Sequence, residues 1–280
     1  MTTINTNISS LHAQAALTSN SRGLQTAMES LSTGKRINSA SDDAAGLTIS
    51  VNFTGQIKSL RQAVRNANDG ISMVQTFEGA TNAITNMLQR MRELAIQASN
   101  STYASSDRTN LDAESKQLIA QIATIASNTK WNGQALLAGS VSTVTFQLGA
   151  ASSDSVEFAS SVYLGDASST GLGSGLIGSA DVDLSTSTGA ISALDTIDTA
   201  ISNVSSARAG MGAMINRLSY AADNLTNTAT HLSESRSRIE DTDYSEATAE
   251  LSKRQVIQQA ATAMLAQANQ QPQMVLQLLK

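Results

Sequence analysis

The sequence predicts a mainly α-helical protein, a long antiparallel, coiled-coil-like helical rod with a small β-hairpin insert. Apolar residues recur at alternating steps of three and four through most of the chain, which is typical of a narrow coiled-coil seam. The single proline, Pro272, leaves long helices with few breakers. The chain has only four Phe, four Tyr and one Trp in 280 residues, fewer than a thick globular core would use.

Residues 1–31 are expected to form the first helix. Its apolar positions are Ile4, Ile8, Leu11 and Ala15 and, after a phase slip, Leu17, Leu24, Met28 and Leu31. The segment 32–34 (STG) then predicts a helix stop. Residues 38–46 (NSASDDAAG) are small and polar, and they indicate a loop or a helix restart capped by Ser41 or Asp42.

Periodicity predicts a long helix over 57–98, with a phase change near Gly70 and Gly79. Because glycine costs about 1 kcal/mol against alanine inside a helix, these two positions indicate a bend or a close helix contact. A second helix follows, and residues 131–133 (WNG) close it with a turn. The apolar face of this second helix contains Leu111, Leu118, Ile122 and Ile125.

The composition changes over 131–207, which contain no Lys or Arg and seven acidic residues. Apolar and polar residues alternate at 144–148, 156–158 and 162–164, and period two predicts short strands paired as hairpins. Residues 165–180 are rich in Gly and Ser and are expected to form an exposed loop.

The clearest helical signal lies over 191–239. Twelve of the fourteen positions in its seam are apolar, and the two exceptions are Arg208 and Arg236. Residues 241–243 (DTD) break this helix, and 251–280 form the last one. The apolar positions of the last helix are Ile257, Ala261, Met264, Ala268, Val275 and Leu278.

The simplest packing folds the chain back on itself. Residues 1–40 and 241–280 then pair in a terminal-helix domain. Residues 41–137 and 191–240 form a helical rod domain. Residues 138–190 are a small β-hairpin and loop excursion of that rod.

Composition also excludes several function classes. The absence of cysteine removes disulfides, thiol catalysis and Cys-based metal sites. A net charge of −5 disfavours a nucleic-acid partner. The N-terminus lacks a basic region followed by an apolar run, so no cleavable signal peptide is expected. No run reaches the roughly 18 apolar residues that membrane insertion needs.

Motifs that suggest chemistry are weak. Residues 173–178 (GSGLIG) match a dinucleotide glycine pattern but lie in a Gly/Ser loop rather than in a βαβ unit. A phosphate loop ending at Gly34 would need glycine at Glu29. His12 and His231 have no second ligand nearby in the sequence, and Asp42 and Asp43 are interpreted as helix-start charges. We therefore expect no enzyme, no cofactor and no metal site.

Apolar chain ends indicate self-assembly. Termini are usually polar and fray, yet neither terminal helix can bury its stripe alone. We therefore expect the two helices to pair with each other and with neighbouring copies. The candidate self-assembly residues are Ile4, Ile8, Leu11, Leu24, Met28, Leu31, Ile257, Met264, Val275 and Leu278.

Residues 89–97 (QRMRELAIQ) place charged side chains around an apolar seam of Met91 and Leu94. One interpretation is a solvated helix face, in which Gln89 and Glu93 support the turn. The other is a contact surface toward a neighbouring subunit, because Arg beside apolar residues is typical of interfaces.

Together these segments resemble bacterial flagellins. The runs that carry the resemblance are INTN at 4–7, LSTGKRINSASDDAAGLTI at 31–49, RNANDGIS at 65–72, EGA at 78–80, QRMRELAIQASNST at 89–102, WNGQALL at 131–137, INRLSYAADNL at 215–225, SRIEDTDYSEATAEL at 237–251 and LAQANQQPQMVLQLL at 265–279. The resemblance covers both ends, about two thirds of the chain, and the runs follow the order found in the family.

The resemblance implies a subunit of the flagellar filament, the extracellular helical propeller for swimming. In this family the terminal helices form the inner core of the filament and the helical bundle forms the outer tube. The chain would leave the cell through the flagellar type III export apparatus, and its partners would be copies of itself, an export chaperone, the filament cap and hook–filament junction proteins. The short insert at 138–190 departs from longer members, which carry large outer domains.

The resemblance also implies a surface that a host Toll-like receptor reads in many family members. The matching positions are Gln89, Arg90, Arg92, Leu94 and Glu114. Two alternative functions stay open: a hook–filament junction protein of the same export system and a coiled-coil scaffold inside the cell. A third, an enzyme built on the acidic insert, is disfavoured because 138–190 contain no metal triad and no nucleophile–base pair.

Overall fold

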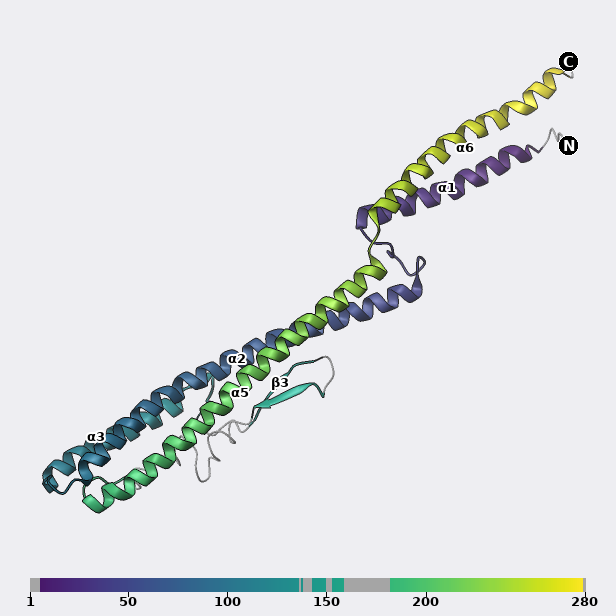
Figure 1. The fold of residues 1–280 in the computed structure, drawn as a ribbon. Helices are drawn as coiled ribbons and strands as arrows, with labels where there is room; N and C mark the ends of the chain where they lie inside the picture. The colour runs from purple at the N-terminus through teal and green to yellow at the C-terminus, as the bar shows by residue number, and fades with distance from the viewer. Residues whose placement is uncertain (1–5, 136, 138–142, 150–152, 159–181, 279–280) are drawn as a thin grey trace. The chain divides into compact units, whose positions relative to one another are not determined.

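The computed structural model describes residues 6–135, 137, 143–149, 153–158 and 182–278, with the backbone alone at 135 and 271–278. The described residues form helices α1 (Ile8–Thr33), α2 (Ala44–Ser99), α3 (Ser105–Asn128), α5 (Ser187–Glu240) and α6 (Tyr244–Leu278) (Figure 1). Between α3 and α5 lie the short strands β1 (Lys130–Trp131), β2 (Gln134–Ala135), β3 (Val144–Gln147) and β4 (Ser155–Phe158). The predicted fold class is confirmed, with long helices packed against each other and small antiparallel hairpins.

The chain divides into two compact units. The first contains residues 1–57 and 230–280, and the second contains residues 58–229. The boundaries therefore fall inside α2 and α5. The division expected from the sequence, with boundaries at 40, 137, 190 and 240, stays a prediction.

Helix α1 ends as the sequence predicts. Gly34 adopts a left-handed conformation (φ 71°), and its N–H donates to the carbonyl oxygen of Ser30 at 2.9 Å. Glycine has no Cβ to oppose this conformation, which satisfies one of the last free carbonyls of the helix.

Helix α2 begins earlier than the expected residue 57, and neither Ser41 nor Asp42 caps it. Asp43 takes this place, because its Oδ1 accepts the N–H of Gly46 at 2.9 Å. Asp42 instead shapes the preceding loop by accepting the N–H groups of Asn38 and Ser39 at 3.1 and 2.8 Å. These backbone donors lower the pKa of the Asp42 carboxyl.

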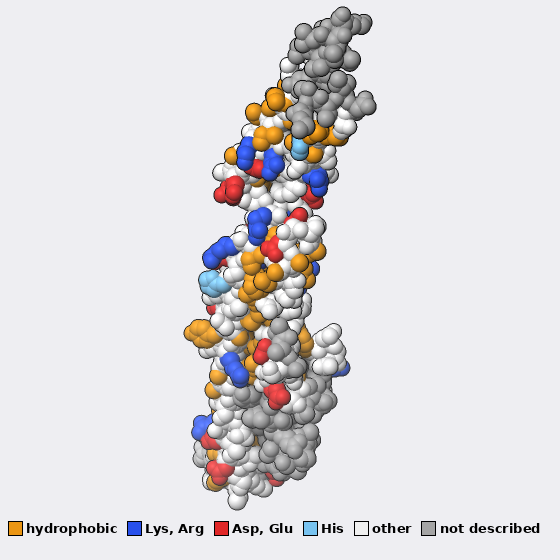
Figure 2. All heavy atoms as spheres, turned by 90° about the vertical axis from the view of Figure 1, so that its right-hand side faces the viewer, with side chains coloured by type: hydrophobic (Ala, Val, Ile, Leu, Met, Phe, Trp, Pro, Cys, Tyr) orange, Lys and Arg blue, Asp and Glu red, His pale blue; other side chains and the backbone are white. Residues whose placement is uncertain are grey.

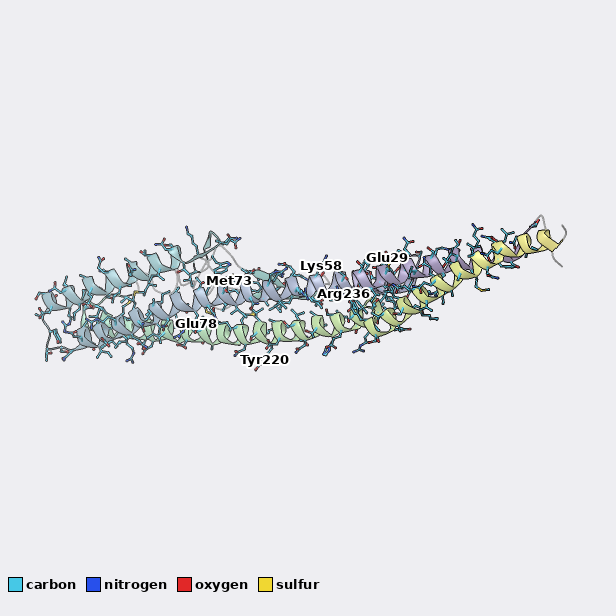
Figure 3. The ribbon with its side chains drawn as sticks, turned by 90° about the horizontal axis from the view of Figure 1, so that it is seen from above. Glu29, Lys58, Met73, Glu78, Tyr220 and Arg236 are labelled. Carbon is cyan, nitrogen blue, oxygen red and sulfur yellow. The ribbon has the colours of Figure 1, made fainter. Side chains whose placement is uncertain are left out.

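The second unit packs α2, α3 and α5 around one hydrophobic core. Met73 on α2 is buried, whereas Tyr220 on α5 points away from the bundle (Figure 3). Six of the eleven buried α5 residues lie on the seam expected from the sequence, and four others lie one residue before a seam position. The buried residues of α5 are Ala190, Ala193, Ile197, Ala200, Val204, Ala207, Met211, Met214, Leu218, Ala222 and Ala229.

The two glycines at the phase change of α2 differ in their surroundings. A Cβ at Gly70 would lie 3.1 Å from the Phe146 ring and 3.2 Å from Cδ1 of Leu218. Gly70 therefore makes the predicted close contact, with both β3 and α5. A Cβ at Gly79 would meet no atom within 4 Å, so packing does not explain this glycine.

The strands form two hairpins. The turn between β1 and β2 has φ 48° at Asn132 and 81° at Gly133, as the Asn-Gly pair favours. In the second hairpin Val144 faces Phe158, and the Phe158 ring meets the Phe77 ring edge-on at 5.7 Å. The expected strand at 162–164 and loop at 165–180 lie outside the described residues.

Candidate functional site

The terminal helices α1 and α6 run antiparallel and pack side by side within the first unit (Figure 1). Each helix contributes one line of buried or half-buried residues at heptad spacing to this seam. The α1 line is Ser10, Ala13, Leu17, Asn20, Leu24, Ala27 and Leu31, and the α6 line is Ala247, Leu251, Arg254, Gln258, Ala261, Leu265 and Ala268. Small and polar residues are frequent in both lines, so the seam buries few large apolar side chains.

Side-chain hydrogen bonds join α1 to α6 near the chain ends. Asn7 Nδ2 donates to the carbonyl oxygen of Ala268 at 2.7 Å, and Asn7 Oδ1 accepts the N–H of Ser10 at 3.1 Å. Asn7 therefore caps α1 and binds α6 at the same time. Ser10 Oγ donates to Asn269 Oδ1 at 2.9 Å.

A polar layer crosses the middle of the seam. Asn20 is 3% exposed, and its Nδ2 donates to the carbonyl oxygen of Arg254 at 2.9 Å, while its Oδ1 is buried without a partner. The Arg254 guanidinium lies over Gly23, where a Cβ would stand 2.8 Å from Cζ. Glu250 holds that guanidinium, with Oε1 2.6 Å from Nε. A side chain at residue 23 would therefore displace Arg254.

We predict that Asn20→Leu stabilises the α1–α6 pair by about 1 kcal/mol, because it removes a buried acceptor without a partner. The measurement is amide hydrogen exchange of the α1 and α6 segments in the full chain, which should slow. Gln25→Leu is the matched control, since Gln25 is exposed on the same helix. Equal slowing by both variants would show that added apolarity, rather than the polar layer, is responsible.

Large apolar side chains lie on the outside of this pair. Figure 2 shows hydrophobic side chains on the surface beside the grey chain ends. We call these residues the outward apolar set: Ile8 (52% exposed), Leu11 (56%), Met28 (50%), Val256 (65%), Ile257 (40%) and Met264 (65%). Leaving so many large apolar groups in water is unfavourable unless another surface covers them.

The structure thus separates the predicted self-assembly residues into two kinds. Leu24 and Leu31 are half-buried in the seam, whereas the other described candidates belong to the outward apolar set. Ile4, Val275 and Leu278 lie outside the residues whose side chains are described. That these residues drive self-assembly stays a prediction.

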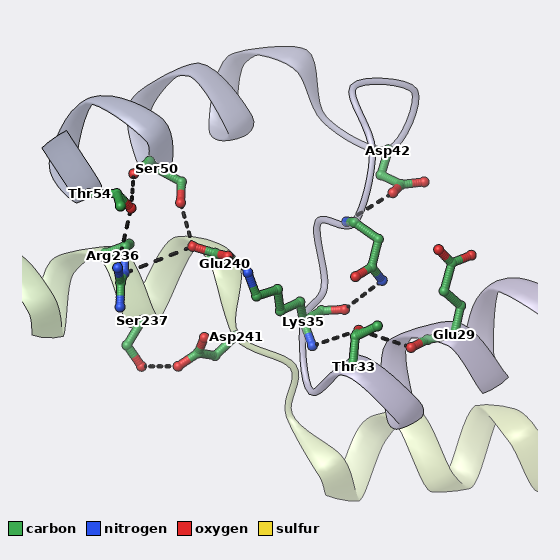
Figure 4. A network of polar contacts seen from close by, with 11 residues as sticks. Glu29, Thr33, Lys35, Asp42, Ser50, Thr54, Arg236, Ser237, Glu240 and Asp241 are labelled. Atoms are coloured by element: carbon green, nitrogen blue, oxygen red, sulfur yellow. Dashed lines mark hydrogen bonds and ion pairs between the residues drawn. The ribbon is translucent and has the colours of Figure 1, made fainter.

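A cluster centred on Glu240 joins the end of α5 to Lys35, between α1 and α2, and to the first turns of α2, all within the first unit (Figure 4). The Glu240 carboxylate pairs with Lys35 and accepts a hydrogen bond from Ser50. Arg236 Nε lies 3.9 Å from Glu240 Oε2, and Arg236 Nη1 donates to Thr54 Oγ1 at 3.2 Å. These contacts with Lys35 and Ser50 lower the pKa of the Glu240 carboxyl.

Backbone bonds reinforce the Glu240 cluster. The N–H of Arg36 donates to the carbonyl oxygen of Glu240 at 2.7 Å, and the N–H of Thr242 donates to that of Gly34 at 3.0 Å. The two passes of the chain through this region are therefore joined by main-chain as well as side-chain bonds.

The predicted contact surface at 89–97 has three buried members, Met91, Leu94 and Ala95, and its other members are exposed. Leu94 is 1% exposed and belongs to the core of the second unit. Arg90 pairs with Glu114 on α3, with Nη2 2.9 Å from Oε1. Arg92 pairs with Asp198 on α5, with Nε 2.6 Å from Oδ1. These carboxylates raise the pKa of both guanidinium groups, and the surface carries two exposed charge pairs.

Gln89 and Glu93 are exposed on the same stretch of α2. Arg90 Nη1 donates to Glu93 Oε2 at 3.1 Å. The structure therefore brings Gln89, Arg90 and Glu114 to one exposed surface and leaves Leu94 beneath it.

The described residues hold no group of three His, Cys, Asp or Glu side chains arranged for a metal ion. Within the same residues, no helix is long and apolar enough to span a membrane. His231 Nδ1 lies 3.6 Å from Glu234 on the same helix, as expected of a surface residue.

Sequence reasoning missed the polar layer and the Glu240 cluster. The positions of Asn20 and Arg254 carry a signal in retrospect, because both fall on heptad lines made mostly of small or apolar residues. Lys35 and Glu240 are distant in the sequence, and no local pattern links them.

Paired termini that leave large apolar side chains uncovered are the feature expected of a structural protein that assembles with copies of itself. Comparison with family models matches residues 4–142 to the bacterial flagellin N-terminal helical region and residues 194–279 to the bacterial flagellin C-terminal helical region. The chain belongs to the bacterial flagellin family. Flagellins are structural filament proteins rather than enzymes.

Individual relatives agree with this assignment. A flagellin of Halalkalibacterium halodurans is 43% identical over 277 residues, covering 99% of both chains. Flagellin B of Vibrio cholerae is 34% identical over a longer alignment of 371 positions, covering 99% of both chains. A Vibrio parahaemolyticus structure described provisionally as a flagellar hook-associated protein covers 71% of this chain and all of its own, with a TM-score of 0.61 and 15% identity. That likeness concerns the fold alone.

Proposed function

We propose that this flagellin polymerises into the flagellar filament by burying its outward apolar set against other copies. The observation that carries the proposal is the contrast on the terminal pair. The seam between α1 and α6 uses many small and polar residues, while six large apolar side chains at least 40% exposed face away from it. The contact between α1 and α6 buries few large apolar side chains. Most of the apolar area that can still be buried therefore lies where other subunits can cover it.

The free energy available is substantial. Fully burying one large apolar side chain contributes about 1.5–3 kcal/mol. Each added copy brings the whole outward apolar set, so several such contributions act together. Contacts between different faces of identical subunits that do not close into a ring give an open helical fibre. The filament then serves as a passive propeller turned by a separate motor.

Electron microscopy of the full-length protein after salting-out, with and without short filament seeds, tests this function. Long uniform fibres that extend from the seeds are expected. Monomers alone would contradict the proposal. Short collars of limited size would instead favour the hook–filament junction protein, which the resemblance left open.

The proposal also includes partners other than copies of this chain, and the first of them would bind the outward apolar set. Before assembly, Val256, Ile257 and Met264 on α6 are exposed to solvent, and a bound export chaperone would keep them from premature association. The filament cap would then guide each new subunit, and junction proteins would join the filament to the hook. In this proposal the chain leaves the cell through the flagellar export apparatus and acts outside it.

The surface around Arg90 carries a second proposed contact, with a host Toll-like receptor. Arg90 and Glu114 are exposed as an ion pair between α2 and α3, which gives a partner charged groups of both signs to bind. Leu94 is buried and would support this surface rather than touch the partner.

We predict that Arg90→Asp weakens receptor signalling by the monomer about tenfold, as expected when an interface arginine is replaced by an opposite charge. A reporter-cell assay measures it. Arg217→Asp makes the same charge change at an exposed residue of α5 and serves as the control. Equal signal from wild type and Arg90→Asp would contradict the receptor contact.

A further inference from the structure

Two members of the outward apolar set differ chemically from the rest, because Met28 and Met264 are thioethers. Their side chains are 50% and 65% exposed, whereas Met73, Met91 and Met211 in the second unit are at most 3% exposed. A thioether sulfur that solvent reaches is open to oxidation by peroxides, and a buried one is shielded. The terminal pair therefore presents reactive sulfur on the surface that is proposed to assemble.

Cysteine is the other side chain that peroxides oxidise readily, and the chain contains none. Peroxide is therefore not consumed by thiols in this protein. Among its described methionines, those most open to solvent are the two on α1 and α6.

We propose that Met28 and Met264 are oxidation sites through which peroxide blocks assembly of the free chain. Hydrogen peroxide transfers one oxygen atom to the thioether sulfur, which supplies the electron pair of the new S–O bond. The O–O bond of the peroxide breaks and water leaves, so that the thioether is oxidised to the sulfoxide and the peroxide is reduced. This inference rests on the proposed function, because it requires neighbouring copies to cover these two residues.

Oxidation opposes assembly because the sulfoxide oxygen is a strong hydrogen-bond acceptor that water satisfies in the free chain. Burying it against apolar neighbours leaves it unpaired. We expect the critical concentration for polymerisation to rise about tenfold for each oxidised site, the order expected for burying an unpaired polar group. Subunits already in a filament would be protected, since their neighbours cover the sulfur.

The experiment uses the full-length protein treated with dilute hydrogen peroxide. Peptide mass mapping of all nine methionines gives the sites of oxidation, and sedimentation after seeding gives the critical concentration. Met28 and Met264 are expected to oxidise first in the free chain and to resist oxidation in preformed filaments. Treatment with methionine sulfoxide reductases should restore assembly, which a chain damaged by unfolding would not do.

A double variant, Met28→Leu with Met264→Leu, isolates the two sites, because leucine keeps the volume and apolarity of methionine without the sulfur. It should polymerise normally and lose the effect of peroxide. The matched control is Met73→Leu with Met211→Leu, which should stay as sensitive as wild type.

Unimpaired assembly of wild type oxidised at both sites would overturn the inference. Undiminished sensitivity of the Met28/Met264 double variant would also overturn it and would place the lesion at another methionine. Failure of the untreated wild type to extend seeds is a separate result, because it would remove the proposed function itself.

Discussion

Removal of residues 251–280 is expected to abolish polymerisation and to leave the second unit folded. The deletion takes away most of α6, including Val256, Ile257 and Met264 of the outward apolar set, and it also uncovers the seam face of α1. The hydrophobic core of the second unit contains no residue from this segment. Seeded sedimentation measures the loss of polymer, and circular dichroism with thermal unfolding measures the remaining bundle.

A single substitution separates the two consequences of that deletion. Ile257→Asp places a charge in the outward apolar set, because Ile257 is 40% exposed and lies off the seam line. Burying an unpaired carboxylate between subunits is strongly unfavourable, so this variant should fail to polymerise while α1 and α6 stay paired. Ser252→Asp adds the same charge at an exposed position of α6 and is the control. Normal filaments from the truncated chain would contradict the proposed role of α6.

Periodicity was sufficient to predict the long helices and their antiparallel return. Gly34 as a helix stop and the Asn132–Gly133 turn followed from the conformations that these residues favour. Each of these features depends on residues close together in the sequence, where local preference and the native structure agree.

The first turns of α2 were missed for a physical reason. Ile49 is 44% exposed and Val51 is 61% exposed, whereas the buried positions are Gly46 and Ser50. The buried line of this segment therefore starts with small and polar residues, which apolar periodicity does not detect. Its start depends instead on the short-range cap at Asp43.

The terminal helices show a different limit. Each carries large apolar residues in phases that differ from the seam, and periodicity does not tell which line faces a helix of the same chain. The structure resolves this for the described residues, since the seam passes through Asn20 and Arg254 while Leu11 and Met264 face outward. A polar residue on a heptad line was the signal that sequence reasoning did not use.

Replacing Glu240 with glutamine is expected to destabilise the local fold where α5 ends. Glutamine keeps the shape of the side chain but removes the charge that Lys35 and Arg236 face. Because Glu240 is largely buried while Lys35 is half exposed, the loss should cost about 2 kcal/mol, between the values for surface and buried pairs. The side chain of Glu240 is 14% exposed, so water compensates little for the loss. Hydrogen exchange of 35–50 and 236–242 should then be about 30-fold faster at neutral pH.

The pH dependence of the same segments gives a second and independent result. The folded state holds the pKa of Glu240 below its usual value of 4.5, because Lys35 and Ser50 stabilise the carboxylate. A lowered pKa means that the unfolded state binds the proton more readily than the folded state. The contribution of Glu240 to the stability of the folded state is therefore fully present above about pH 4.5, and it is lost as the pH falls through the folded-state pKa. Wild type should therefore lose protection of these segments on acidification.

Glu240→Gln should show a smaller change over this range, because glutamine does not titrate. Glu250→Gln is the matched control, since the Glu250 carboxyl also has a lowered pKa but lies at the surface of α6, away from this cluster. Identical acid responses of wild type and Glu240→Gln at 35–50 would mean that other carboxylates control this region. A response lost only in Glu240→Gln would show that one carboxylate joins the end of α5 to the loop between α1 and α2, next to the helices that carry the outward apolar set.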